Sequence, residues 1–452
     1  MNIQKNSSDR FNLLTKNYIP WGSLGQNNAT CSKIVSELIR TKAIDNFYIT
    51  SSDTIEKFIK QINDFKKKFR TIVYISGHKC YPMMSRQAQV MKNNGYKTFL
   101  INMEPLKLND LKSLLNCFDD ILANCLFFPI LQKILKKIKP DFFHIQCWMF
   151  SYHLGKFIIK NKGKSKVICD FYDVTGMYAE EKHLKSIFDE FNVEQDLENE
   201  KFIFNNADGI IHRYKQNIFL DYSKKYKRKK NILEFQQYPL KIIDLKRKYK
   251  GEKLKFVYCG TLIPPNDKNH PKELFNGTGL IYVFDYILRS GHELNIYLPL
   301  NGTYEFNKWI FDLKDTKFPH TLKIHDSMPI ENLIEEISKY DLGVNVQKIY
   351  KETSKISEFT YTSCMGTKNY TYLEAGLPIL VNDEYSYMKE LVEENNIGLS
   401  LKSNNLSQIN NFLKNIDIDL LKENVRKFNI KNNLFVKGDL LKGFYESLQN
   451  KN

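Results

Sequence analysis

The feature that most limits what this chain can fold into is a repeated alternation of two kinds of segment. Residues 71–76 (TIVYIS) and 97–102 (KTFLIN) are short runs rich in β-branched and aromatic residues, which are typical of buried strands. Between them, residues 84–94 have a helical pattern that stops at Gly95. Because parallel strands need crossover connections of this kind, the pattern predicts a parallel sheet covered by helices on both faces.

The alternation runs through the 452 residues twice. The further strands that we expect in the two cycles are residues 140–146, 166–170 and 209–213, and then 255–260, 293–298, 321–325, 342–346 and 378–381. A single core rarely extends beyond about 250–300 residues. We therefore predict an α/β protein with two doubly wound, Rossmann-like domains that face one another across a cleft.

The same pattern sets the expected domain boundaries. Residues 1–70 would be an N-terminal extension or the first part of the first domain, and residues 431–452 would be a C-terminal helix that packs back on that domain. The segments between them are a first Rossmann-like domain over 71–235, a basic linker over 236–254 and a second Rossmann-like domain over 255–430. An apolar content of 42% is ordinary for globular proteins and excludes a mainly disordered chain.

Positive charge is concentrated near the junction of the two cycles. Residues 224–255 hold 13 Lys or Arg and three acidic residues, more than half of the net charge of +16. Such a run is typical of a solvated surface, of a contact with anionic lipid or of nucleic-acid binding. Because no RNP, KH, zinc-finger or basic-zipper pattern occurs, we expect no nucleic-acid partner and keep the solvated surface and a peripheral membrane contact as alternatives.

Other features indicate where the protein works. No run of 18 apolar residues occurs, and the N-terminus lacks the apolar stretch of a secretory signal. The eight cysteines show no C-x-x-C spacing, and three of them lie in apolar runs that suit reduced thiols. We expect a cytoplasmic protein, with the inner face of the membrane as the alternative.

The segment 366–381 (GTKNYTYLEAGLPILV) contains the strongest candidate site. A loop of small polar residues, including Gly366 and Thr367, leads into a helix that begins near Lys368. A helix N-terminus presents unpaired N–H groups and the positive end of the helix dipole, which suits a diphosphate, and Lys368 adds a full charge there. The alternative is a capped helix with an exposed lysine. We favour a catalytic role for Lys368 in stabilising a departing diphosphate.

Five segments in this order resemble those of GT-B nucleotide-sugar glycosyltransferases, especially the large retaining group called family 4. Besides 366–381, they are 140–144 (PDFFH), 201–211 (KFIFNNADGII), 256–261 (FVYCGT) and 340–344 (YDLGV). The resemblance covers about residues 71–430. It implies a GT-B architecture, a nucleoside-diphosphate-sugar donor without a separate cofactor, and retention at the anomeric carbon. We also expect no metal, because the His and acidic residues show no clustered ligand spacing.

The resemblance also implies donor contacts. It places Gly260 and Thr261 near the phosphates with a basic residue after them, for which Lys268 and Lys272 both remain candidates. On the segment 366–381 it implies that Gly366, Thr367, Tyr370, Thr371 and Glu374 bind substrate. One departure stands out: the family has carboxylates at the positions of Ser363 and Thr371. Glu374, one turn further along the helix, is our candidate for a ribose contact, and an acid in a surface ion pair is the alternative.

The acceptor side is expected at the end of the strand 166–170. Asp173 is the candidate catalytic residue, either taking the proton of the acceptor hydroxyl or holding a sugar hydroxyl, and Asp170 is a candidate substrate-binding residue. The alternative for both is an aspartate that caps a turn. We interpret His144, inside an apolar run, as a core histidine.

Together these features predict a hexosyltransferase that acts on a glycan or lipid-linked acceptor in the synthesis of cell-surface polysaccharide or glycoconjugate. Because acids are missing at positions 363 and 371, a catalytically silent nucleotide- or sugar-binding subunit remains an alternative. A GT-B-like nucleotide-sugar epimerase is the other alternative.

Overall fold

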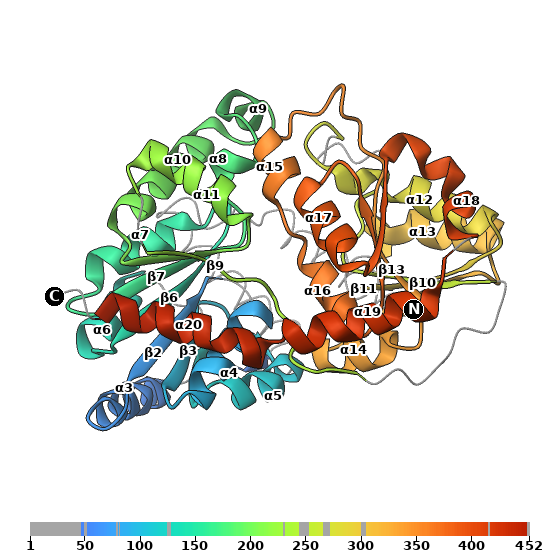
Figure 1. The fold of residues 1–452 in the computed structure, drawn as a ribbon. Helices are drawn as coiled ribbons and strands as arrows, with labels where there is room; N and C mark the ends of the chain where they lie inside the picture. Colours follow the sequence, from blue (N-terminus) through green and yellow to red (C-terminus); the bar gives the residue numbers. More distant parts are fainter. Residues whose placement is uncertain are drawn as a thin grey trace, which may run out of the picture. The chain divides into compact units, whose positions relative to one another are not determined.

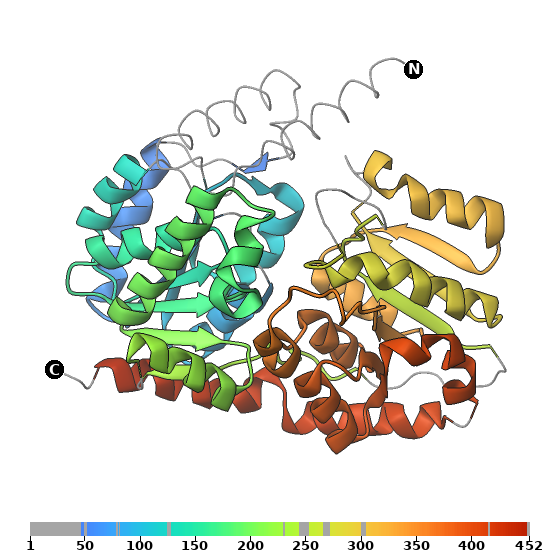
Figure 2. The same ribbon diagram turned by 90° about the horizontal axis from the view of Figure 1, so that it is seen from above.

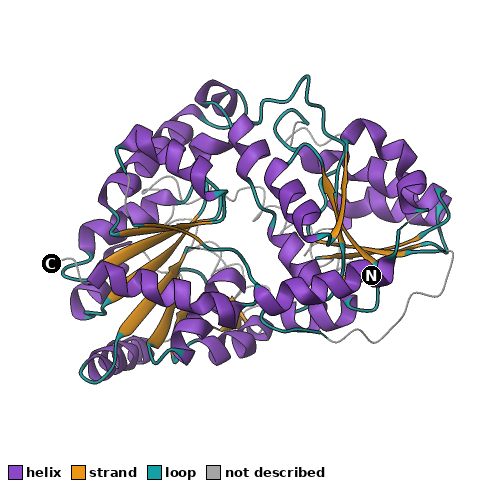
Figure 3. Ribbon diagram, viewed as in Figure 1, coloured by secondary structure: helices purple, strands orange, loops and turns teal. Residues whose placement is uncertain are grey.

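The computed structural model of the protein describes residues 47–48, 52–77, 80, 82–123, 128–228, 231–243, 253–264, 272–299, 304–414 and 416–449. These residues form two compact units. The N-terminal unit contains the described residues up to Gln236 and those from Lys437 onwards, and the C-terminal unit contains the described residues of Gln237–Val436. In both units the strands are enclosed by helices (Figure 3).

The N-terminal unit is built on a parallel sheet. In the described part of the chain its order is β5-β3-β2-β6-β7-β8-β9, and every neighbouring pair is parallel. The strands are β2 (Thr71–Ser76), β3 (Lys97–Asn102), β5 (Asp120–Ala123), β6 (Phe142–Cys147), β7 (Lys166–Phe171), β8 (Gly209–His212) and β9 (Ile232–Glu234). A separate antiparallel pair joins β1 (Phe47–Tyr48) to β4 (Leu106–Lys107).

Helices connect these strands and cover the sheet (Figure 1). They are α3 (Ser52–Lys66), α4 (Pro82–Asn93), α5 (Leu108–Cys117), α6 (Phe128–Lys137), α7 (Tyr152–Asn161), α8 (Thr175–Tyr178), α9 (Glu181–Lys185), α10 (Glu190–Asn206), α11 (Gln216–Ser223) and the 3₁₀ turn η2 (Lys224–Tyr226). The last helix, α20 (Leu434–Gln449), returns to this sheet (Figure 2). Its Tyr445 is buried, and its hydroxyl contacts Nδ1 of His144 on β6 at 2.5 Å.

The C-terminal unit repeats the design with its own core. Its described strands are β10 (Lys255–Cys259), β11 (Glu293–Leu298), β12 (Leu322–Asp326), β13 (Leu342–Asn345), β14 (Ile379–Asn382) and β15 (Gly398–Leu401), in the parallel order β12-β11-β10-β13-β14-β15. The helices are α12 (Leu280–Arg289), α13 (Tyr304–Lys317), α14 (Ile330–Ile337), α15 (Glu358–Ser363), α16 (Thr367–Glu374), α17 (Ser386–Asn395), α18 (Ile409–Leu413) and α19 (Ile418–Lys431), with the 3₁₀ turns η3 (Asn276–Gly279) and η4 (Ser403–Gln408).

Aspartates placed just before strands hold the starts of neighbouring strands. Oδ2 of Asp141, before β6, accepts the amide of Thr71 at 2.8 Å. The same contact recurs in both units, from Val167 N to Asp208, from Thr98 N to Asp119 and from Lys255 N to Asp341. Each of these amides belongs to the first or second residue of its strand, and the carboxylate gives it a hydrogen-bond partner. The Pro-Asp, Ala-Asp and Tyr-Asp dipeptides singled out in the sequence therefore have a structural function.

The predicted α/β fold with two doubly wound sheets is confirmed. The expected strands 71–76, 97–102 and 293–298 match β2, β3 and β11 residue for residue. All six residues of β2 are buried, as a β-branched run covered on both faces requires. No helix among the described residues is both long and apolar enough to cross a lipid bilayer.

Candidate functional site

The order of strands in the C-terminal unit indicates where a ligand should bind. From β10 the chain proceeds outward to β11 and β12, and then returns to the other side of β10 as β13. Ligands of open parallel sheets bind at such a reversal, beyond the carboxyl ends of the two strands. Here those ends are Cys259 on β10 and Asn345 on β13, and the N-terminus of α16 lies beside them.

The residue after β10 is a glycine whose backbone touches Lys368. Gly260 has a φ of +138°, which non-glycine residues rarely adopt. A Cβ atom at this position would lie 2.6 Å from Cε and 3.2 Å from Nζ of Lys368. Both the backbone angle and the close approach of the lysine therefore require glycine. The structure brings together two residues that the sequence analysis assigned to the phosphates.

The ammonium group of Lys368 is held by Tyr258, a residue that the sequence analysis missed. Nζ donates a hydrogen bond to Oη of Tyr258 at 2.8 Å and lies 4.5 Å from the centre of its ring. The tyrosine hydroxyl in turn donates to the carbonyl of Thr261 at 2.8 Å. Among the described residues, no carboxylate forms an ion pair with Lys368. A half-buried cation without a counter-ion favours an anionic ligand.

The first turn of α16 adds backbone donors at the same place. Its N-cap is Gly366, which has no side chain to cap the helix. The amide of Asn345 Nδ2 donates to Oδ1 of Asn369 at 2.7 Å and so joins the end of β13 to this turn. An uncapped helix start leaves N–H groups available to an anion. Gly366, Thr367 and Lys368 therefore lie with Gly260 in one corner, which we call the anion-binding corner after the ligand that we expect it to take.

Tyr372 fixes α16 to both strands of the reversal. Its hydroxyl accepts the amide of Cys259 on β10 at 2.9 Å and donates to the carbonyl of Val344 on β13 at 3.1 Å. Complete burial raises the pKa of the Tyr372 hydroxyl well above its ordinary value, so the hydroxyl stays protonated and can donate. A Cβ atom on Gly343 would overlap the Tyr372 ring. The position of the anion-binding corner thus depends on the contact of this ring with Gly343 of β13.

Gly343→Ala should therefore destabilise the protein. The added methyl group must displace the Tyr372 ring, and overpacking of this kind costs about 1–3 kcal/mol. Urea unfolding of the two proteins measures the difference. Gly443→Ala on α20 is the matched control, because a Cβ there meets nothing within 4 Å and should leave stability unchanged or slightly raised. Equal stability of Gly343→Ala and the wild type would contradict the packing described.

Glu374 lies at the C-terminal end of α16, where its carboxylate binds backbone amides of the segment 240–241. Its carboxylate is buried, and Oε1 accepts the amides of Leu240 at 3.1 Å and of Lys241 at 3.2 Å. Backbone hydrogen bonds of this kind give Glu374 a structural role at the start of the C-terminal unit. Its predicted contact with a donor ribose stays a prediction.

Two further predicted donor-binding residues face the same segment. Oγ1 of Thr371 accepts a hydrogen bond from Nε2 of Gln237 at 3.3 Å. The buried ring of Tyr370 packs edge-on against Tyr238, with 5.7 Å between ring centres. The structure thus divides the predicted donor set: the first turn of α16 lies with Gly260, and the later residues lie against 237–241.

Lys268 and Lys272 both remain candidates for the basic residue that is expected after Gly260. Thr261 is exposed beside the anion-binding corner, and Lys268 lies outside the described residues. Lys272 is exposed, and its Nζ lies 5.0 Å from the centre of the Tyr350 ring. The roles of Thr261, Lys268 and Lys272 stay predictions.

In the N-terminal unit, the two candidate aspartates have different surroundings. The side chain of Asp173 is 41% exposed, and Oδ1 pairs with Nη2 of Arg213 at 2.9 Å. Asp170 is fully buried, and its Oδ2 lies 3.3 Å from Nε2 of His144. Asp173 is therefore accessible to a ligand from solvent, whereas Asp170 is not. The interpretation of His144 as a core histidine is confirmed, because it is buried with two hydrogen-bonding partners.

Carboxylates of α10 hold the segment that follows Asp173. Asp196 accepts hydrogen bonds from Oγ1 of Thr175 at 2.5 Å and from the amide of Phe150 at 2.8 Å. Oε2 of Glu200 accepts the amide of Gly176 at 3.0 Å. Burial raises the pKa of Asp196 to about 7. Neither carboxylate could be recognised from local sequence, because their partners lie more than twenty positions away.

The raised pKa of Asp196 predicts a pH dependence of stability. An unfolded aspartate titrates near pH 3.9, so between about pH 4 and pH 7 the folded protein binds more protons at this site. The free energy of unfolding contributed by Asp196 should therefore fall as the pH rises from about 4 to 7 and level off above it. Urea midpoints of the wild type and Asp196→Asn across this range isolate the effect. A difference between the two proteins that does not change with pH would contradict it.

Several basic residues of 224–255 make contacts within the fold. Lys225 Nζ lies 3.6 Å from the centre of the Tyr222 ring, and Lys241 pairs with Glu335 at 3.3 Å. Lys224 forms an ion pair with Asp221 at 2.6 Å. Part of the charge concentration therefore has structural partners, and residues 229–230 and 244–252 of the run lie outside the described part.

Comparisons with known proteins agree with this architecture. The family model "Glucosyltransferase 3-like, C-terminal domain" matches residues 303–444, which include α16. Anabaena HepE, solved in complex with UDP-glucose, superposes with a TM-score of 0.58 at 10% identity, covering 83% of this chain and 99% of its own. The catalytic domain of Arabidopsis thaliana starch synthase IV, bound to ADP and acarbose, has a TM-score of 0.50 at 10% identity, covering 84% and 99%.

These likenesses show the fold. The chain shares the two-sheet α/β architecture of GT-B glycosyltransferases. A second structure of HepE, with UDP and glucose, has a TM-score of 0.57 at 11% identity over 84% of this chain and 100% of its own. No curated protein matches the sequence.

Proposed function

We propose that the protein is a glycosyltransferase that moves a sugar from a nucleoside-diphosphate sugar to a hydroxyl group of an acceptor. The observation that carries this proposal is the ammonium group of Lys368, which lies against Gly260 at the uncapped start of α16. This corner lies at the strand reversal of a parallel sheet, where such folds bind nucleotides.

The chemistry needs a positive site at this corner. The bond between the anomeric carbon and the oxygen of the β-phosphate breaks, and the acceptor oxygen forms the new bond to that carbon. The departing diphosphate gains negative charge, which Lys368 and the first-turn amides of α16 would stabilise. We assign this charge stabilisation to the chain's own groups, without a metal ion.

On the acceptor side we assign a role to Asp173. Its exposed carboxylate either takes the proton that the acceptor hydroxyl loses or holds a hydroxyl of the acceptor in place. The ion pair with Arg213 fixes the direction of that carboxylate. The resemblance to family 4 favours retention of the anomeric configuration, which NMR analysis of the product would test.

The comparisons support the choice of donor. HepE was solved with UDP-glucose, and starch synthase IV with ADP and acarbose. By analogy we propose a nucleoside-diphosphate hexose as the donor of this chain. The basic stretch 224–255 favours an acceptor that is a glycan or a lipid-linked precursor of a surface polysaccharide.

A panel of nucleotide sugars tests the proposal. Each donor is incubated with the protein, and release of the nucleoside diphosphate is measured with and without simple glycoside and lipid-linked acceptors. We expect release from at least one donor, and faster release with a suitable acceptor. Failure of every donor both to bind and to turn over would contradict the proposed function.

One observation favours a second candidate, a silent nucleotide- or sugar-binding subunit. Ser363 and Thr371 occupy the positions where family 4 has carboxylates. Ser363 is buried and donates a hydrogen bond to the carbonyl of Phe359, one helical turn earlier. Thr371 accepts a hydrogen bond from Gln237. The nearby Glu374 is engaged by backbone amides. Tight binding of a nucleotide sugar without turnover of any donor would favour this candidate.

A further inference from the structure

The N-terminal unit contains a cavity at the amino ends of its strands, whereas Asp173 lies beyond the carboxyl end of β7. The cavity has a volume of about 670 Å³, which is within the range of small-molecule sites. Its walls come from the amino ends of strands: Lys166 begins β7, and Asp208 and Asn231 directly precede β8 and β9. Because Asp173 follows the carboxyl end of β7, a ligand in this cavity would be separate from the proposed acceptor.

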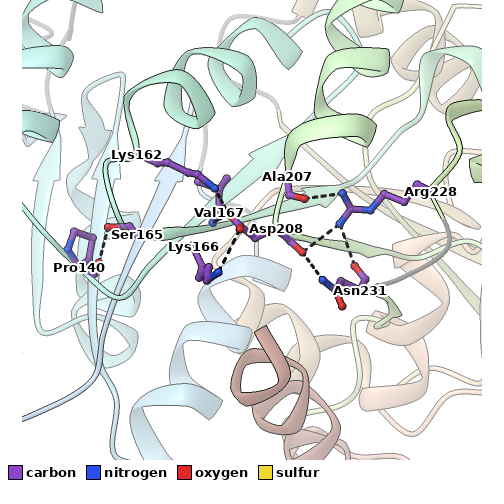
Figure 4. Close-up of polar contacts among 9 residues, drawn as sticks. All are labelled: Pro140, Lys162, Ser165, Lys166, Val167, Ala207, Asp208, Arg228 and Asn231. Atoms are coloured by element: carbon purple, nitrogen blue, oxygen red, sulfur yellow. Dashed lines mark hydrogen bonds and ion pairs between the residues drawn. The ribbon is translucent and has the colours of Figure 1, made fainter. Parts of the chain in front are cut away.

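Positive charge dominates the lining. Lys166, Lys227 and Arg228 contribute three cations, against the single carboxylate of Asp208. That carboxylate is already engaged by the amide of Val167 and by Lys166, whose Nζ lies 3.8 Å away (Figure 4). It also forms an ion pair with Lys162, from outside the lining (Figure 4). The carboxylate therefore cannot offset the whole positive charge of the cavity.

Arg228 contributes positive charge to the cavity, and no carboxylate among the described residues forms an ion pair with it. Its guanidinium donates to the backbone carbonyl of Ala207 at 2.6 Å, just after α10 (Figure 4). It also donates to the carbonyl of Phe204 at 3.0 Å. Burial lowers the pKa of Arg228, and the nearby Asp208 opposes this shift only in part. Since carbonyl oxygens carry no formal charge, the cation remains a source of positive potential for the cavity.

Lys227 occupies a backbone position that favours glycine. Its φ is +57°, and it is one of four described non-glycine residues with a positive φ, of which Asn231 also lines the cavity. A lysine in this conformation is strained where a glycine is not. Its side chain is exposed, and no ion pair or side-chain hydrogen bond joins it to a described residue. Lys227 is the C-cap of η2, and its left-handed conformation ends that turn.

Besides the charged residues, the lining has two asparagines, Asn205 and Asn231, and four apolar or aromatic residues. Phe204 and Tyr226 come from α10 and η2, and Leu448 comes from the last turn of α20. Apolar surface beside clustered cations suits a ligand that carries both a phosphate group and a carbon skeleton.

We infer that this cavity is a binding site for a phosphate-bearing ligand, in which Lys227 and Lys166 contact the phosphate beside Arg228. This inference is independent of the proposed transfer reaction. The phosphate could belong to the headgroup of an anionic lipid or to a free phosphorylated metabolite, and the experiment separates these two sources.

The key variant is Lys227→Gly, which removes a cation and relieves the strained backbone together. We expect a protein at least as stable as the wild type in thermal unfolding, and phosphate binding that is roughly tenfold weaker, as for the loss of one charge-assisted hydrogen bond. The matched control is Lys224→Ala, which removes one cation from the same basic run but from a residue outside the lining.

Binding is measured by calorimetric titration with inorganic phosphate at constant ionic strength. All variants carry Lys368→Ala, so that phosphate at the start of α16 is not counted. A second arm measures sedimentation with vesicles of phosphatidylglycerol, and with vesicles of phosphatidylcholine as the neutral reference. Weaker binding of Lys227→Gly in both arms, with Lys224→Ala unchanged, would support a lipid phosphate. The same pattern in the phosphate arm alone would support a free phosphorylated metabolite.

Two results would overturn the inference. Equal weakening by Lys227→Gly and Lys224→Ala would show a diffuse attraction by the basic run rather than a site. Absence of binding to phosphate and to both kinds of vesicle would show that the cavity takes no phosphate-bearing ligand. A Lys166→Ala variant provides an independent check, because Lys166 begins a strand and its ion pair with Asp208 is long.

Discussion

Lys368→Ala should reduce turnover by roughly two to four powers of ten, because preset charge at a departing group is a large term in catalysis. In the structure the ammonium group of Lys368 lies against Gly260 and donates a hydrogen bond to Tyr258. Among the described residues it has no carboxylate partner. Its charge is therefore available to a diphosphate. Initial rates of nucleoside-diphosphate release, measured with the donor identified in the panel, give the size of the effect.

Lys323→Ala is the matched control for this variant. Lys323 lies near the amino end of the edge strand β12 of the same sheet. There it pairs with Glu293 at 3.2 Å, away from the carboxyl ends of β10 and β13 where the anion-binding corner lies. Its loss should change turnover by less than about twofold, since a single exposed ion pair contributes little. If Lys368→Ala kept wild-type turnover with an intact fold, the leaving-group role would be wrong.

Asp173→Asn should reduce turnover by roughly two to four powers of ten if the carboxylate takes the acceptor's proton. The affinity for nucleoside diphosphate should stay the same, because Asp173 lies in the N-terminal unit and the anion-binding corner is built within the C-terminal unit. Steady-state rates and calorimetric titration of the nucleotide measure the two quantities separately.

The control for this variant is Asp221→Asn, another exposed aspartate of the N-terminal unit with a lysine partner. It should leave both turnover and nucleotide affinity unchanged. Loss of nucleotide affinity in Asp173→Asn would place Asp173 in the wrong role. A modest loss of turnover with a raised KM for the acceptor would instead assign it to holding the acceptor.

Local patterns were sufficient for most strands and for the helix start at Lys368, whereas the short strands β5, β9 and β15 were not expected. The strands β2 and β3 are short apolar runs with clear ends, so their bounds could be predicted from neighbouring residues alone. Lys368 and Gly366 could be found because a loop of small residues before a helix is visible in the sequence. The Asp-containing dipeptides were equally visible, and the structure explains them by the strand amides that they satisfy.

The residues that were missed depend on contacts between distant segments. Tyr258 meets Lys368 from 110 positions away, and nothing in the strand that contains it indicates a polar partner. The assignment of Glu374 to the donor rested on its helical position, whereas the structure engages it with the amides of 240–241, more than 130 positions earlier. Asp196 likewise meets Thr175 only because α10 packs beside α8. Local periodicity carries no information about such contacts.

The central claim is that the corner formed by Gly260, Gly366 and Lys368 binds the diphosphate of the donor. A crystal structure of the protein soaked with UDP, and in parallel with GDP, tests it most directly. We predict that the β-phosphate lies within hydrogen-bonding distance of Nζ of Lys368 and of the first-turn amides of α16. A diphosphate bound elsewhere in the protein, with Lys368 still bonded only to Tyr258, would contradict the claim.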